Sequence, residues 1–175
     1  MEALDLAALV GAVFLLLIVI RGAMLPRDYE VARMITLELD VVKVWPLMVD
    51  PRQMNSWRSD LRRVMRVPGE RDLPAWIDVG VISRRNWRAT ELVAFKLVRA
   101  TVENGLFPMR GEARIEITGN EARTIVVFRE KGRIDSQFVR VLARWAIGLH
   151  SQPDAFLRAL CRKFDQPAKI TDVEA

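Results

Sequence analysis

The sequence predicts an α+β domain behind one N-terminal transmembrane helix, with a curved antiparallel sheet of about six to seven strands around a long C-terminal helix. Three observations lead to this prediction. The chain begins with an uncharged apolar run, and its middle consists of alternating segments separated by short turns. From Asp135 onward, apolar residues recur at helical spacing.

The apolar run covers residues 6–20, reads LAALVGAVFLLLIVI, and ends at Arg21. These residues span only about 22 Å of helix, whereas a bilayer core is about 30 Å thick. Extending the helix on both sides, with Arg21 snorkelling, makes up the difference until Pro26 ends it. We therefore assign residues 1–26 to a transmembrane anchor and residues 27–32 to a juxtamembrane linker.

A cleaved signal peptide and a buried core helix are the alternatives to an anchor. Glu2 and Asp5 are acidic and no small-residue cleavage site follows, which does not fit a signal peptide. Arg21, Arg27 and Arg33 all lie on the C-terminal side of the run. By the positive-inside rule, the N-terminus lies outside and the soluble domain is cytoplasmic.

The composition limits the partners that this chain can have. A net charge of +5 and a pI near 10.0 suit an anionic partner such as the inner membrane leaflet. The arginines are scattered and no zinc-finger or RNA-binding signature is present, so no nucleic-acid partner is expected. Cys161, the only cysteine, cannot form an intrachain disulfide, which fits a reducing cytoplasm.

The soluble domain opens with a strand and two short helices. Residues 33–39 alternate as a half-buried strand does, and Asp40 can cap the helix that follows. Pro46 predicts that this helix is short or kinked, and Pro51 can open a second one. The extended segments that follow are residues 61–67, 76–82, 87–93, 95–102, 113–118 and 124–131.

Short turns between these segments predict an antiparallel meander, with a hairpin at residues 119–121. A helix follows, whose apolar stripe includes Phe138, Leu142, Trp145 and Leu149. Pro153 should kink or restart it. Residues 33–165 form the domain, and residues 166–175 are a polar C-terminal tail.

Several short motifs in this order resemble one known superfamily. They are Ile35–Glu38 followed by Val44-Trp45, Asp50-Pro51 with Trp57-Arg58, Glu130-Lys131-Gly132, and the helical stretches FVRVLAR (138–144) and AFLRAL (155–160). Together they resemble the START-like (SRPBCC) superfamily, in its polyketide cyclase/dehydrase-like branch. The resemblance implies the helix-grip fold over residues 33–165 and a ligand cavity between sheet and helix. Asp40, in place of an opening proline, and Pro153 depart from the pattern.

The sequence offers few groups for catalysis. His150 is the only histidine, lies late in the helical region, and has no partner identifiable from spacing. One histidine and one cysteine cannot build a typical metal site, and no glycine-rich phosphate loop is present. We therefore expect no catalytic residue, no metal and no cofactor, and lean against an enzyme.

Glu130 is the most informative acid, because it shares a strand face with Val126 and Phe128. If this face is buried, the carboxylate needs a partner, for which Arg144 or Arg99 is suitable. The alternative is a solvated acid at the strand end, and Asp78 carries the same ambiguity.

We expect the cavity to be lined by aromatic and aliphatic residues around one acid, because ligand pockets are mostly apolar. The expected lining residues are Trp76, Phe128, Glu130, Phe138, Leu142, Trp145 and Leu149. Pro108 and Met109 lie in a loop that could gate the cavity.

Three functions are compatible with these features. The first is a membrane-anchored START-like domain that binds a hydrophobic small molecule, such as a lipid or isoprenoid. The second is an aromatase/cyclase-type enzyme acting on a polyketide-like substrate. The third is a non-catalytic interaction module for a membrane partner.

Overall fold

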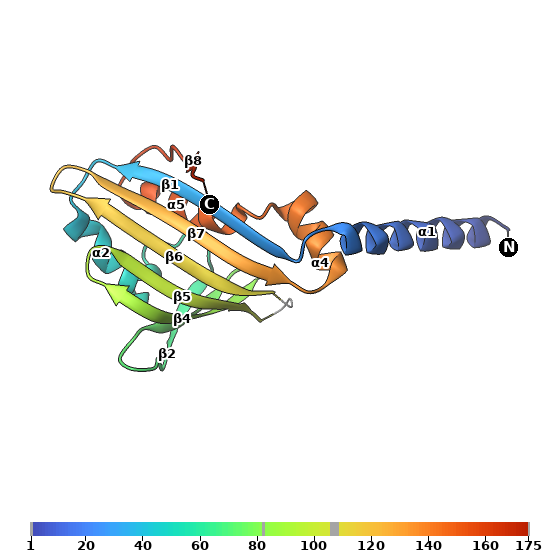
Figure 1. Ribbon diagram of the computed structural model, residues 1–175, viewed down its shortest axis with the longest axis horizontal. Helices are drawn as coiled ribbons and strands as arrows, with labels where there is room; N and C mark the ends of the chain where they lie inside the picture. The colour runs from blue at the N-terminus through green and yellow to red at the C-terminus, as the bar shows by residue number, and fades with distance from the viewer. Residues whose placement is uncertain (1, 82, 106–108, 175) are drawn as a thin grey trace.

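The computed structural model describes residues 2–81, 83–105 and 109–174. Within them, one antiparallel sheet has the strand order β2-β3-β4-β5-β6-β7-β1-β8. The sheet curves around the C-terminal helix α5 (Ser151–Lys163), and α1 (Glu2–Met24) projects away from it (Figure 1). This is the expected α+β helix-grip architecture.

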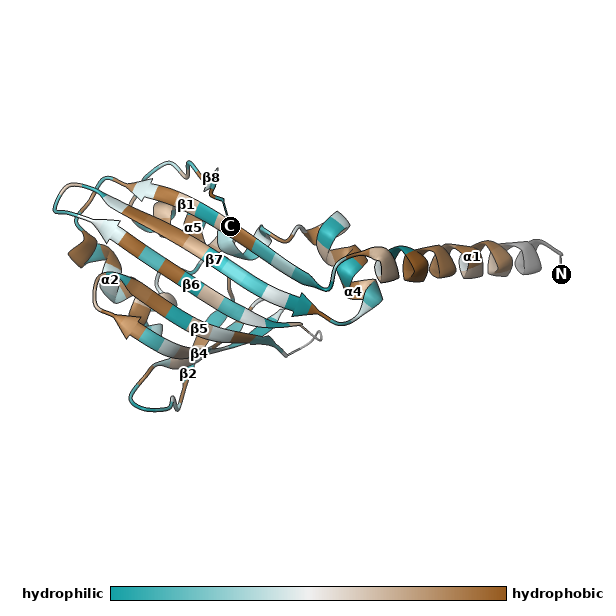
Figure 2. Ribbon diagram, in the orientation of Figure 1, coloured by the Kyte–Doolittle hydropathy of each residue, from teal (hydrophilic) through white to brown (hydrophobic). Residues whose placement is uncertain are grey.

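The N-terminal helix α1 is long and apolar enough to cross a membrane over Ala7–Met24. Between Leu9 and Met24 most of its apolar side chains are exposed, unlike those of a core helix, and this part of the helix is mainly hydrophobic (Figure 2). Near its C-terminal end, α1 packs against α4. There, a Cβ on Gly22 would lie 2.3 Å from the Gln137 carbonyl oxygen, so the two backbones can approach only because residue 22 is glycine.

Strand β1 (Asp28–Leu37) begins five residues before the expected start at Arg33. The expected linker, residues 27–32, is therefore wrong: all but its first residue pair with β7 (Thr124–Ile134). The polar tail also differs from the expectation, because β8 (Thr171–Asp172) pairs with the other edge of β1. Backbone pairing across the sheet, which local sequence does not encode, orders both segments.

Two short helices close one end of the sheet. In α2 (Val41–Val49), the Asp40 carboxylate accepts from the Val42 N–H, and Pro46 lies inside the helix. In α3 (Pro51–Met54), Pro51 occupies the first position, where its missing N–H costs nothing. Both helices were expected.

The meander consists of β2 (Arg63–Val67), β3 (Ala75–Val79), β4 (Arg84–Val93), β5 (Leu97–Asn104), β6 (Met109–Gly119) and β7. Each strand alternates between the two faces, as the striped colouring of Figure 2 shows. The expected hairpin joins β6 to β7, and the Asn120 side chain accepts from two backbone N–H groups in its turn. Ile82, at the end of one expected strand, lies outside the described residues.

The C-terminal helical region is interrupted at Gly148, not at Pro153. It consists of α4 (Gln137–Leu142), the π-helical turn η1 (Ala143–Ile147) and α5. Gly148 adopts φ +84°, which glycine accepts readily and other residues avoid. Pro153 lies in the first turn of α5, where a helix tolerates proline. The region expected to form one long helix therefore consists of two units, α4–η1 and α5, which are separated at Gly148.

The two units cover different parts of the sheet. The main core lies beneath α5, where Phe156, Leu157 and Leu160 are almost completely buried. A second, smaller core lies beneath α4 and η1 and consists of Ile134, Val139 and Ala143. Beneath α5, side chains therefore fill the space between the sheet and the helix.

Candidate functional site

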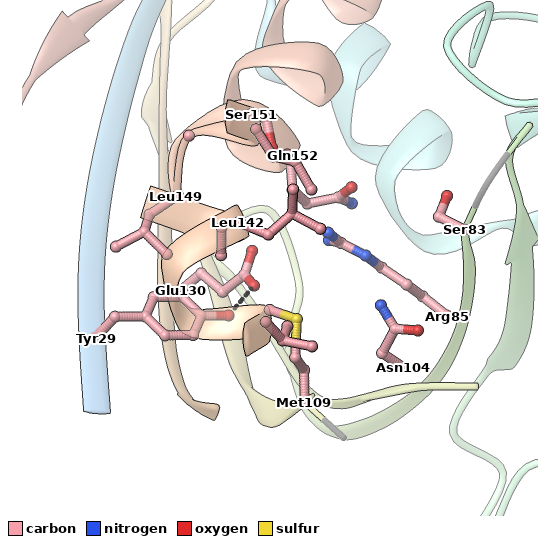
Figure 3. A pocket seen from close by; sticks show the side chains of 14 residues that line it. Tyr29, Ser83, Arg85, Asn104, Met109, Glu130, Leu142, Leu149, Ser151 and Gln152 are labelled. Carbon is pink, nitrogen blue, oxygen red and sulfur yellow. Dashed lines mark hydrogen bonds between the residues drawn. The ribbon is translucent and has the colours of Figure 1, made fainter. Parts of the chain in front are cut away.

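A cavity of about 260 Å³ lies between the inner face of the sheet and the α4–η1–α5 joint (Figure 3). It is lined by Tyr29, Ser83, Arg85, Asn104, Met109, Glu130, Val139, Leu142, Ala143, Ile147, Gly148, Leu149, Ser151 and Gln152. The helical side supplies mainly aliphatic groups. The strands supply most of the polar ones, so the cavity has an apolar roof and a polar floor.

Tyr29 and Glu130 form the centre of the polar floor. The Tyr29 hydroxyl donates to Oε1 of Glu130 at 2.7 Å, across adjacent strands β1 and β7. Glu130 is 6% exposed. Burial, together with the negative Glu130, raises the pKa of Tyr29 above its ordinary range, so the phenol keeps its proton.

Gly132 explains how the Tyr29 ring fits there. A Cβ at position 132 would lie 2.6 Å from atoms of the Tyr29 ring. The ring therefore packs directly over the Gly132 backbone, two residues beyond the carboxylate to which it bonds. The Glu130-Lys131-Gly132 motif thus supplies both the acceptor for the tyrosine and the space that it occupies.

Three polar atoms of cavity-lining residues are buried without a hydrogen-bond partner among the described residues. They are Oε2 of Glu130, Nη1 of Arg85 and Nε2 of Gln152. Buried polar atoms are rarely left unpaired, because each loses the hydrogen bonds that water would supply. One acceptor and two donors are therefore left to a water or a ligand.

A second buried polar cluster lies outside this cavity. Arg58, 3% exposed, forms two hydrogen bonds to Asp60 and lies 3.3 Å from Oδ2 of Asp78. Its guanidinium also lies over the Trp57 and Phe156 rings. Burial raises the pKa of Asp78, and Arg58 opposes this shift only in part. Asp78 is thus a buried core acid that lies near Arg58 and, across the β3–β4 pair, opposite Arg85, while neither of its carboxylate oxygens has a hydrogen-bond partner among the described residues.

The seven expected lining residues divide into those that line the cavity, those buried in the main core and those exposed on the surface. Glu130, Leu142 and Leu149 line the cavity. Trp76 and Phe128 are instead buried in the main core, where Trp76 stacks on Trp87 with centroids 5.4 Å apart.

Phe138 and Trp145 do not line the cavity and are 53% and 66% exposed. The apolar stripe assumed one regular helix, whereas the π-helical turn and Gly148 change the direction of successive side chains. Trp145 faces the end of α1, and Arg21 lies over its ring at 5.6 Å. These two residues belong to the outer surface of the cavity roof.

The expected arginine partner of Glu130 is also wrong. Arg144 donates to the Pro26 carbonyl, and Arg99 pairs with Glu91 and Glu112 on exposed parts of the sheet. Tyr29 takes their place as the partner. Of the two expected gate residues, Met109 lines the cavity and Pro108 lies outside the described residues.

Sequence reasoning missed Tyr29, Arg85 and Gln152. Arg85 lies two residues before the buried Trp87, so the strand period could have placed it on the inner face. Tyr29 was assigned to the linker, and Gln152 to a continuous helix. The local sequence contains no signal that predicts the proximity of Tyr29 or Gln152 to Glu130.

The described residues contain no cluster of three histidine, cysteine or acidic side chains able to hold a metal ion. His150 is exposed before α5. Cys161 is buried in the main core, and burial raises the pKa of its thiol. Neither residue lines the cavity.

No family model matches the sequence, and no curated protein is significantly similar to it. Solved structures are similar in fold. A START superfamily protein from Mycobacterium smegmatis has a TM-score of 0.61 at 11% identity, covering 78% of this chain and 97% of its own. The Zhui aromatase/cyclase from Streptomyces sp. R1128 has a TM-score of 0.64 at 11% identity, covering 79% and 94%.

Norcoclaurine synthase from Thalictrum flavum has a TM-score of 0.58 at 7% identity, covering 85% of this chain and 92% of its own. These identities are low, and what the structures share with this chain is the arrangement of sheet and helices. The chain therefore has the START-like helix-grip fold.

Proposed function

We propose that this chain binds an amphiphilic small molecule in the cavity beneath α4 and η1, while α1 holds the domain at the cytoplasmic face of a membrane. One observation carries the proposal: the cavity combines aliphatic walls with buried polar atoms that have no hydrogen-bond partner in the described part of the chain. A cavity that served only packing would be filled or wholly apolar. START-like relatives of similar fold make ligand binding a reasonable use for it.

The position of the cavity supports the membrane part of the proposal. Its roof, α4–η1, packs against the C-terminal end of α1, where a spanning helix would leave the bilayer. Arg21, Arg27 and Arg144 surround this junction, and basic residues favour an anionic cytoplasmic leaflet. A ligand dissolved in the bilayer would have a short path to the cavity.

Native mass spectrometry of the full-length chain in nanodiscs tests the binding proposal. The unaltered chain should carry or accept a small amphiphile. Leu142→Trp should fill the cavity and lower binding by at least about tenfold, since it places a large ring where the ligand body lies. Val42→Trp, an exposed position on α2, is the matched control. Absence of any bound mass in the unaltered chain would contradict the proposal.

A cyclase-type reaction is the second candidate, favoured by the position of Glu130. Its Oε2 faces the cavity and could remove a proton from carbon beside a carbonyl group, which Arg85 would polarise. The Zhui aromatase/cyclase shows that this fold can serve such an enzyme. Glu130→Gln should then abolish turnover of a polyketide-like substrate while binding persists. Unchanged products from Glu130→Gln would exclude this role.

A further inference from the structure

We propose that the polar floor selects ligands that carry both a hydroxyl group and a carboxylate on a compact apolar body. This inference rests on the proposed binding function and names the class of ligand. It follows from three unpaired buried atoms, from where they lie, and from the size of the cavity.

Glu130 supplies the acceptor. Tyr29 already donates to Oε1, and Oε2 is buried without a partner among the described residues. Glu130 is 6% exposed, so bulk water reaches Oε2 poorly. A ligand hydroxyl that donates to Oε2 would remove the cost of leaving a buried carboxylate oxygen unpaired.

Arg85 and Gln152 supply the donors, from β4 and from the first turn of α5. In Figure 3 the Arg85 side chain extends across the cavity toward Gln152 and Leu142. Within residues 2–81, 83–105 and 109–174, Nη1 of Arg85 and Nε2 of Gln152 both lack an acceptor. A carboxylate has enough lone pairs to accept from both, and arginine binds carboxylates well.

The charges of the floor favour one anionic group accompanied by a neutral donor. A lone ammonium would face Arg85, and a doubly charged phosphate would face Glu130, so each would meet a like charge in the same cavity. A ligand with one hydroxyl and one carboxylate offers Glu130 and Arg85 a complementary group each.

The size of the cavity limits the rest of the ligand. Its volume of about 260 Å³ falls just below the range of about 300–1,000 Å³ typical of small-molecule pockets. The aliphatic wall formed by Val139, Leu142, Ile147 and Leu149 suits one small ring system or one short chain. A lipid with two acyl chains would not fit in it.

The test uses the full-length chain in nanodiscs with three matched probes: a hydroxynaphthoate whose hydroxyl and carboxylate lie on different rings and cannot hydrogen-bond to each other, naphthoate and naphthol. We expect hydroxynaphthoate to bind about tenfold more tightly than either single-function probe, since naphthoate lacks the donor to Glu130 and naphthol lacks the acceptor for Arg85 and Gln152. This comparison requires no variant. Equal affinities for the three probes would overturn the inference and leave the binding function standing. If no probe and no other amphiphile binds, the proposed function itself fails.

Two variants test whether Glu130 binds the hydroxyl of the ligand and Arg85 its carboxylate. In Glu130→Gln the amide oxygen can keep the Tyr29 hydrogen bond, which leaves an NH₂ group in the place of Oε2. Hydroxynaphthoate should then bind no better than naphthoate. In Arg85→Met, hydroxynaphthoate should bind no better than naphthol. Arg84→Met, on the outer face of the same strand, should retain the full preference. A preference unchanged in Glu130→Gln and Arg85→Met would contradict the assignment.

Discussion

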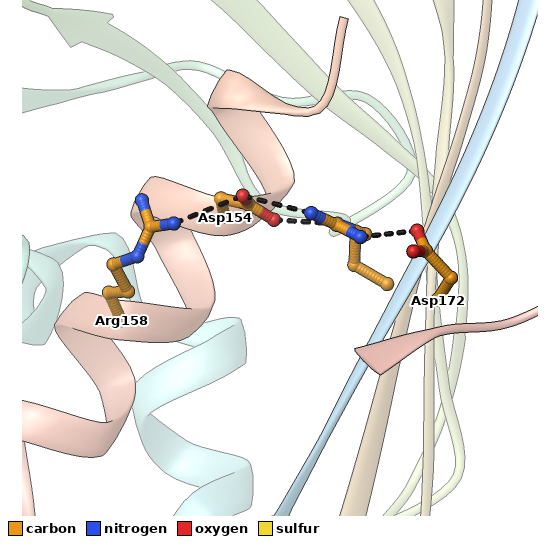
Figure 4. A network of polar contacts seen from close by, with 4 residues as sticks. Asp154, Arg158 and Asp172 are labelled. Atoms are coloured by element: carbon orange, nitrogen blue, oxygen red, sulfur yellow. Dashed lines mark hydrogen bonds and ion pairs between the residues drawn. The ribbon is translucent and has the colours of Figure 1, made fainter. Parts of the chain in front are cut away.

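Arg33 on β1 and Asp154 on α5 form a two-point ion pair that joins the sheet to the helix beneath it. Nε of Arg33 lies 2.8 Å from Oδ1 of Asp154, and Nη2 lies 3.2 Å from Oδ2 (Figure 4). Arg158 also donates to Asp154, and Asp172 on β8 contacts Arg33 from the other side. The pair lies beyond the cavity, so its role is structural.

We expect Asp154→Asn to lower the free energy of unfolding by about 2–3 kcal/mol, because it leaves the largely buried Arg33 without its main partner. Asp172→Asn should cost under about 1 kcal/mol, since the Asp172 side chain is 81% exposed. Chemical denaturation of the full chain in micelles measures both. Equal losses in the two variants would contradict the importance of the buried pair.

Tyr29, the only tyrosine of the chain, can be titrated without interference from another phenol. Its raised folded-state pKa means that above pH about 10 the folded chain keeps a proton that the unfolded chain releases. The stability that Tyr29 contributes is therefore present below that pH and is lost as pH rises. Tyrosinate absorbance should appear only as the chain unfolds, and Tyr29→Phe should weaken the alkaline loss of stability. Ionisation near pH 10 in the folded chain would contradict the buried Tyr29–Glu130 pair.

Gly22→Leu should separate α4 from α1, because even a Cβ at this position would overlap the Gln137 carbonyl. Hydrogen exchange of the α4 and η1 amides should accelerate, while α5 amides stay protected. Gly11→Leu is a matched control on the same helix, since nothing lies within 4 Å of a Cβ there. Similar exchange in both variants would mean that α1 does not support the cavity roof.

Trp145 should lie at the bilayer interface if α1 spans the membrane, since tryptophan favours that depth. Lipids brominated near the headgroups should quench part of the fluorescence of the full chain. This quenching should disappear in Trp145→Phe and persist in Trp45→Phe, because Trp45 lies on α2 at the other end of the sheet. Unchanged quenching in Trp145→Phe would place the roof away from the bilayer.

The sequence was sufficient for features that depend on neighbours along the chain. Alternation predicted the strands, Asp40 and Pro51 predicted helix starts, and the turn at residues 119–121 predicted a hairpin. Each of these signals acts within a few residues, so no knowledge of the tertiary structure was needed.

The cavity depended on relationships that the local sequence does not contain. Tyr29 meets Glu130 across 101 positions of chain, through a strand register fixed only by the completed sheet. Gly148 separates α4 and η1 from α5, and Phe138 and Trp145 on the first of these two units are exposed. Helical spacing alone could not distinguish this path from a continuous helix, because a π-helical turn leaves no clear pattern in the sequence.

The division at Gly148 assigns core packing and cavity covering to different helical units, whereas one continuous helix would have to do both. Residues of α5 pack the main core, whereas α4 and η1 cover only the cavity and the small cluster beside it. Substitutions at Leu142 or Ile147 can therefore reshape the cavity while the main core beneath α5 keeps its side chains.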